Sequence, residues 1–132
     1  MSEKQLLNTI TEAIIGAAVT VHHELGPGML ESIYEACLMF ELIDRKWRVD
    51  RQVALPVTYR GTVLDCGFRI DLLVEDEVIV EVKAVESIHP VHRMQLLSYL
   101  RQRHCKVGLL LNFNVKWLSR EGITRLVNGF PD

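Results

Sequence analysis

Residues 68–84 constrain the fold of this chain more than any other stretch. They read FRIDLLV, then a polar Glu-Asp-Glu loop, then VIVEVKA. Both halves are rich in Val, Ile and Leu and alternate along the chain, so we expect two strands joined as a hairpin. A three-residue loop sets a register in which Asp71 lies directly opposite Glu81.

That register predicts an electrostatic defect on the hairpin. Two carboxylates that face each other across a ladder repel, and a fold selected for stability alone would avoid the pair. A divalent cation between Asp71 and Glu81 would turn the defect into a binding site. Side chains alternate along a strand, so Lys83 shares the face of Glu81. The alternative is two exposed carboxylates, with Lys83 in a weak surface salt bridge.

Composition limits the classes of protein to which the chain can belong. With 132 residues, 48% of them hydrophobic, we expect one globular domain over residues 1–132. The net charge of −2 predicts no global attraction to nucleic acid, so any such contact needs a local basic patch. Three cysteines without a CxxC pair argue against structural zinc and disulfides and suit a reducing cytoplasm. We expect no signal peptide and no membrane contact.

Two amphipathic helices precede the strands. Ser2 and Gln5 form a capping-box pattern, and the helix that follows ends at Gly26. A second helix is expected over residues 29–46. On it, Glu31 falls within the apolar arc and Glu35 at the border of that arc. A carboxylate on a buried face needs a cation or a partner, which makes Glu31 a candidate third metal ligand.

Two further polar residues on these helices are ambiguous. His22, in the last turn of the first helix, is interpreted as complementing the helix dipole rather than as an active-site residue. Glu41 lies near the middle of the apolar arc, and we expect it to pair with a buried arginine rather than to take part in catalysis.

The remaining segments predict an α/β fold with one central sheet. Strands are expected at 49–55 and 57–59, and a buried strand at 107–112. A helix is expected over residues 89–104, with Val91, Met94, Leu97 and Leu100 among its apolar positions. The tail predicts a strand or loop around Trp117 and then a short helix that ends at Asn128-Gly129.

The helix over residues 89–104 carries two features of functional interest. Gln95 and Tyr99 are four residues apart, so they lie on one face, which can point back at the hairpin. Residues 89–106 also contain no acid and four cations, namely Arg93, Arg101, Arg103 and Lys106. This run is consistent with a phosphate-binding surface, or equally with a solvated helix end whose cations complement the dipole.

Together these residues resemble a known nuclease superfamily. Asp71 followed by Glu81-Val82-Lys83 resembles the core of the PD-(D/E)XK nucleases, and Gln95-x-x-x-Tyr99 resembles the QxxxY element of their RecB-like branch. The pattern Gly28-x-x-Glu31-x-x-Tyr34 is similar to the signature of the GxxExxY protein family. The resemblance covers roughly residues 10–129 and continues through Arg51-Gln52, Pro56-Val57-x-Tyr59-x-Gly61 and Gly108-Leu109-Leu110-Leu111-Asn112-Phe113. Trp47 and Asn114 stand where this family commonly has turn glycines.

The resemblance implies a restriction-endonuclease-like α-β-β-β-α-β core around a central mixed sheet, with an additional N-terminal helix. It implies metal binding by Asp71, Glu81 and the backbone carbonyl of Val82, with Glu31 completing the site. Mg²⁺ or Mn²⁺ suits these hard oxygen ligands.

The resemblance also implies hydrolysis of phosphodiester bonds. Lys83 would orient or deprotonate the attacking water, or stabilise the transition state. Gln95 and Tyr99 would hold the water, the lysine or the substrate backbone. The expected partner is nucleic acid, DNA ahead of RNA, and a homo-oligomer is compatible with the small size of the chain. The alternative is a non-catalytic module that binds nucleic acid or protein on a nuclease fold.

Overall fold

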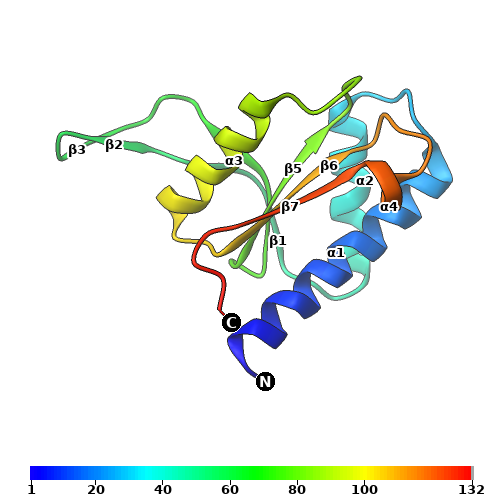
Figure 1. The fold of residues 1–132 in the computed structure, drawn as a ribbon, viewed down its shortest axis with the longest axis horizontal. Helices are drawn as coiled ribbons and strands as arrows, with labels where there is room; N and C mark the ends of the chain where they lie inside the picture. The colour runs from blue at the N-terminus through cyan, green and yellow to red at the C-terminus, as the bar shows by residue number, and fades with distance from the viewer. Residues whose placement is uncertain (132) are drawn as a thin grey trace.

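Five strands form one mixed sheet in the computed structural model, which describes residues 1–131 (Figure 1). The strand order is β1-β4-β5-β6-β7, and β5 and β6 are parallel whereas the other neighbours are antiparallel. The strands span Val49–Ala54 (β1), Arg69–Val74 (β4), Val78–Lys83 (β5), Val107–Asn112 (β6) and Ile123–Val127 (β7). The predicted α/β fold with a central mixed sheet is confirmed.

The β4–β5 hairpin has the predicted loop length and register. Val74 pairs with Val78 and Leu72 pairs with Val80, so three residues form the turn. Two of them, Glu75 and Asp76, have φ angles of 54° and 57°. The regular ladder stops at Leu72, directly before the predicted carboxylate pair.

Helices α1 (Glu3–Leu25) and α2 (Glu31–Asp44) cover one face of the sheet. The predicted capping box is present, because the side chains of Ser2 and Gln5 each accept a hydrogen bond from the other residue's backbone N–H. The core between helices and sheet contains Ile10, Ile14, Tyr34, Leu38, Leu72, Val80 and Leu109. These helices therefore bury the face of β5 opposite to that of Glu81 and Lys83.

Helix α3 (Pro90–Arg103) covers the other face of the sheet. Its buried residues are Leu96 and Leu100. Two of the apolar positions expected on this helix, Val91 and Met94, do not join the core, because they are 43% and 68% exposed. The helix is weakly amphipathic, so the spacing of its apolar residues does not determine which side meets the sheet. The crossover connection from β5 determines it instead.

The tail differs from the predicted one. Helix α4 (Leu118–Glu121) is a single turn, and residues 123–127, predicted as helix, form strand β7 instead. The prediction failed because β7 completes the edge of the sheet by pairing antiparallel with β6, which is a long-range interaction.

A separate two-stranded ribbon interrupts the chain between β1 and β4. Strands β2 (Val57–Tyr59) and β3 (Thr62–Leu64) pair only with each other. Their turn, Arg60-Gly61, has φ angles of 51° and 78°, as expected for a two-residue hairpin loop. We call this ribbon the arm; Figure 1 shows it projecting from the body of the molecule beside α3.

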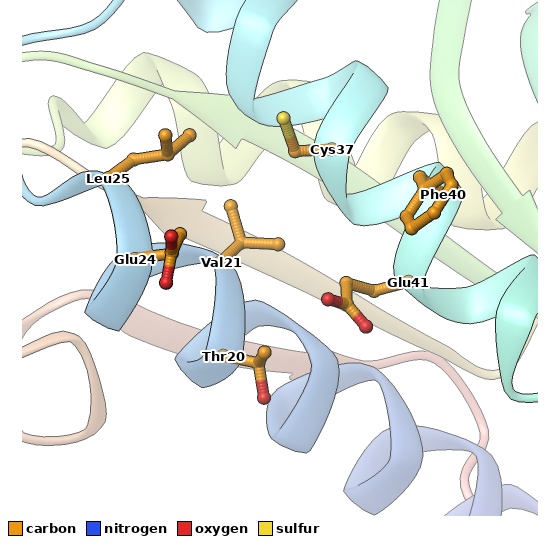
Figure 2. Close-up of a pocket in the computed structure, with 7 residues that line it drawn as sticks. All are labelled: Thr20, Val21, Glu24, Leu25, Cys37, Phe40 and Glu41. Carbon is orange, nitrogen blue, oxygen red and sulfur yellow. The ribbon is translucent and has the colours of Figure 1, made fainter.

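Glu41 lies away from the central sheet, at a hollow of about 160 Å³ between α1 and α2 (Figure 2). Its carboxylate is 3.8 Å from the guanidinium of Arg45, which is exposed. The prediction of a buried arginine partner is therefore wrong. Among residues 1–131, the structure contains no helix with the length and apolar character needed to cross a membrane.

Candidate active site

Asp71 and Glu81 are locked together where the β4–β5 ladder ends. The backbone N–H of Asp71 donates to Oε2 of Glu81 at 2.8 Å, and the backbone N–H of Val82 donates to Oδ2 of Asp71 at 2.8 Å. Each carboxylate thus accepts a main-chain hydrogen bond from the opposite strand, in place of the regular ladder. These bonds fix both acids beside each other, as the register predicts.

Both acids lie in an environment that disfavours their negative charge. Burial, together with the charge of Asp71, raises the pKa of Glu81 from 4.5 to about 8. Burial also raises the pKa of Asp71 from 3.8 to about 6, with a contribution from Glu35, although the hydrogen bond from Val82 opposes the shift. An added cation would relieve both effects at once.

Lys83 is the last residue of β5 and is partly buried. Its ammonium lowers the pKa of both Asp71 and Glu81. This effect is smaller than the opposing effect of burial, so both pKa values remain raised. Burial lowers the pKa of His92 at the start of α3, and Lys83 lowers it further. Lys83 is therefore close enough to act electrostatically on the carboxylate pair and on α3.

A buried acid that the sequence pattern does not assign to the site is linked to Asp71 through the side-chain amide of Gln52. Glu35, on α2, is buried and accepts hydrogen bonds from Arg51 Nε at 2.6 Å and from Gln52 Nε2 at 2.8 Å. The same Gln52 amide donates to Oδ1 of Asp71 at 3.3 Å. Gln52 has a φ angle of 54°, an uncommon conformation for a non-glycine residue in a strand. Its conformation and contacts together hold Asp71 from the β1 side.

Two features of the sequence are associated with these residues, but neither assigns them to the site. Glu35 borders the apolar arc of α2, and Arg51-Gln52 belongs to the resemblance described above. The helical spacing of α2 alone predicts that Glu35 lies closer to solvent than Glu31. This spacing takes no account of the Arg51 and Gln52 side chains of β1, which bind Glu35.

Glu31 occupies the rim of the site. The prediction that Glu31 lies on a buried face is wrong, because the residue is exposed at the first position of α2. Its carboxylate accepts the backbone N–H of Ala84 at 2.9 Å, directly after Lys83. Glu31 thus anchors α2 to the end of β5.

Tyr99 is near the carboxylate pair, as the predicted face of α3 requires. Burial raises the pKa of its phenol, and the charges of Glu81 and Asp71 raise it further. The ring of Tyr99 lies 6.3 Å from that of Phe68, which precedes β4. Gln95, one turn earlier, is exposed.

The four predicted cations divide into two groups. Arg103 pairs with Asp76 at 2.9 Å and Lys106 pairs with Glu3 at 2.6 Å. Arg93 and Arg101 are exposed, and neither forms an ion pair with any residue of the described chain. The basic run is therefore not one continuous surface of free charge.

The donor set fits a hard divalent cation that keeps part of its hydration. Within residues 1–131, no three His, Cys, Asp or Glu side chains form a group that could hold a metal by themselves. Mg²⁺ typically binds one or two carboxylates and retains waters that substrate phosphates replace. Asp71 and Glu81 supply that number of carboxylates, and a bound cation would offset the burial and repulsion that raise their pKa values.

Comparison with known proteins agrees with this geometry. The family model described as the PD-(D/E)XK nuclease superfamily matches residues 8–126, which is most of the chain. No curated protein and no solved structure matches the sequence.

Proposed function

Because the chain belongs to the PD-(D/E)XK nuclease superfamily, we propose that it is a metal-dependent nuclease that hydrolyses phosphodiester bonds in DNA. We further propose that it is a member of the GxxExxY branch. The single observation that carries the proposal is the interlocked pair Asp71–Glu81 beside Lys83. A stable fold gains nothing from a buried Glu81 beside a partly buried Asp71, both with raised pKa values, whereas a metal site uses two such carboxylates as ligands.

Asp71, Glu81 and the backbone carbonyl of Val82 would hold Mg²⁺ or Mn²⁺. Such an ion neutralises charge on the scissile phosphate and makes water more acidic. The Val82 N–H occupies Oδ2 of Asp71, and Oδ1 accepts a long hydrogen bond of 3.3 Å from the Gln52 amide. That weak contact can be exchanged for a metal ligand at little cost.

The chain's own groups would position the reactants. Lys83 would hold the attacking water or stabilise the charge that develops on the phosphate. Tyr99 and Gln95 would orient the water or the substrate backbone from α3. Glu35 would act as a positioning residue, because the Gln52 amide joins it to Asp71. Glu31, on the rim, would complete the site once substrate is bound.

A cleavage panel tests the proposal. Purified protein with Mn²⁺ is incubated with supercoiled, linear, single-stranded and branched DNA and with RNA. We expect cleavage of DNA, and loss of that cleavage in Asp71→Asn and in Lys83→Ala. Asp76→Asn is the matched control, because Asp76 lies in the turn of the same hairpin and pairs with Arg103; it should cleave as the unmodified protein does.

The outcome also separates the alternative function. A protein that binds DNA but cleaves no substrate with Mn²⁺ or Mg²⁺ would be a binding module on a nuclease fold. A protein that neither binds Mn²⁺ by calorimetry nor cleaves any nucleic acid would refute the nuclease proposal.

A further inference from the structure

The arm exposes apolar side chains that nothing in the described chain covers. Tyr59 and Val63 are 63% and 67% exposed, on opposite faces of the ribbon. An isolated two-stranded ribbon is only marginally stable in water. A ribbon with this much exposed apolar surface is typical of an element that is completed by a partner.

The charge of the arm indicates what kind of partner it meets. Residues 55–64 contain one cation, Arg60, and no acid. Arg60 is exposed at the turn, and no ion pair with it forms in the described residues. In a chain of net charge −2, an acid-free projection with an arginine at its tip favours a polyanion.

The base of the arm adds a second free cation. A hollow of about 310 Å³ lies between residues 56–58 and the end of α3, where Arg101, Gln102 and His104 line it. Arg101 is the cation of this helix end that is free to meet a phosphate, since the neighbouring Arg103 pairs with Asp76. The hollow thus places a guanidinium beside the root of the arm.

The arm is also continuous with the candidate active site. It leaves the sheet after β1 and returns at β4, two residues before Asp71. Phe68, at its return, lies against Tyr99, whose phenol is near both carboxylates. A polymer that contacts the arm is therefore led toward Asp71 and Glu81.

The shape of the arm selects between nucleic-acid duplexes. The major groove of B-form DNA is about 12 Å wide and admits a two-stranded β-ribbon, whereas that of A-form RNA is too narrow for side chains to enter. Strands of three residues span about 10 Å, comparable to the depth of the B-form groove.

We propose that the arm enters the major groove of duplex DNA, with Arg60 reaching into the groove and Arg101 holding a backbone phosphate at its root. The inference rests on the proposed nuclease function and adds the class of substrate, double-stranded DNA in B form. Tyr59 and Val63, on the two faces of the ribbon, then pack against the two walls of the groove, which covers the exposed apolar surface.

Binding of a fluorescent DNA duplex to the Lys83→Ala protein, measured by anisotropy over a series of salt concentrations, tests this proposal without cleavage. Arg60→Gln should weaken binding roughly fivefold or more, and Arg101→Gln should reduce the slope of log affinity against log salt by about 0.9. Arg103→Gln, on the same helix, is the matched control and should change the affinity less than about twofold. Thermal unfolding confirms that each variant is folded, and Tyr59→Ser replaces Arg60→Gln should that variant unfold.

The remaining outcomes overturn the proposal in distinguishable ways. If the unmodified protein cleaves duplex DNA but Arg60→Gln and Arg101→Gln bind as tightly as the control, the arm does not bind DNA. The nuclease proposal then still stands. If Arg60→Gln and Arg101→Gln weaken binding to an A-form RNA duplex as much as binding to the DNA duplex, the inference from the width of the major groove is refuted. Light scattering that shows a dimer dissociated by Tyr59→Ser, with DNA binding unchanged, would assign the arm to a second copy of the chain. No binding and no cleavage of any nucleic acid would refute the nuclease proposal itself.

Discussion

Replacing Glu81 with glutamine should make the stability of the metal-free protein less sensitive to pH. The pKa of Glu81 is about 8 in the folded protein against a usual value of 4.5, so the folded state binds this proton more tightly than the unfolded state. Its contribution to stability is therefore fully present below pH 4.5 and is lost as the pH rises through 8.

The magnitude follows from the two pKa values. Between pH 5 and pH 7, the single group lowers the free energy of unfolding by about 2.5 kcal/mol. Glu81 is only 7% exposed, so solvent screening reduces this figure little. The substituted glutamine cannot titrate, but its amide oxygen can still accept the N–H of Asp71, which the carboxylate accepts at 2.8 Å. Asp71 titrates in both proteins, and the difference between them reports Glu81 together with its repulsion from the ionised Asp71, which is one cause of the raised pKa of Glu81.

Urea denaturation in EDTA at pH 5, 6 and 7 measures this effect. From about pH 5 to pH 7, we expect the free energy of unfolding of the unmodified protein to fall by about 2.5 kcal/mol more than that of Glu81→Gln. Glu77→Gln is the matched control, because Glu77 is an exposed acid in the turn of the same hairpin, and it should behave as the unmodified protein. Parallel pH profiles for the unmodified protein and Glu81→Gln would refute the inference that buried Glu81 carries unfavourable charge.

The other predictions concern the metal, the second buried acid and the packing of α3. Saturating Mn²⁺, at about 100 times its dissociation constant, should raise the free energy of unfolding by about 2.7 kcal/mol. More Mn²⁺ should be needed at pH 6 than at pH 8, because protons compete with the metal for Asp71 and Glu81. An unchanged melting temperature by calorimetry would contradict the metal site. Glu35→Ala should lower the free energy of unfolding by about 1–3 kcal/mol in urea denaturation, because the hydrogen bonds from Arg51 and Gln52 are lost. It should also lower kcat about 10- to 100-fold, because Asp71 is no longer held in place. An unchanged kcat would show that Glu35 does not position Asp71. Gly108→Ala should cost about 1–3 kcal/mol in the same assay, because a Cβ there would lie 2.9 Å from a Leu96 methyl carbon; unchanged stability would show that α3 moves freely.

The sequence predicted those parts of the site that depend on local rules. The hairpin register follows from loop length and strand alternation, both of which lie within residues 68–84, so Asp71 and Glu81 were placed correctly. The helix spacing of Gln95 and Tyr99 is likewise local and puts both on one face of α3, whereas the nearness of Tyr99 to the acids depends on how α3 packs on the sheet.

The parts that depend on distant partners were not predictable. Glu35 is buried because Arg51 and Gln52 of β1 meet it, and nothing in the periodicity of α2 contains that information. Residues 123–127 form a strand because β6 has an open edge. The backbone of Gln52 adopts a positive φ that no pattern in β1 signals.

The costs that this fold tolerates are concentrated at one residue. Asp71 lies where the β4–β5 ladder ends, opposite a β1 residue with strained backbone, and beside an acid that does not ionise readily at neutral pH. The strained backbone and the unfavourable charge each cost of the order of 1–3 kcal/mol, and uncharged amide side chains in place of the two acids would relieve the charge. Strain and unfavourable charge that coincide in this way are expected at functional sites rather than in purely structural sheets. It follows that Asp71→Asn and Glu81→Gln, whose amide oxygens can still accept the backbone N–H groups of Val82 and Asp71, should raise stability at neutral pH while abolishing cleavage. A structural salt bridge between Lys83 and the acids would not produce this combination, since breaking such a bridge would lower stability.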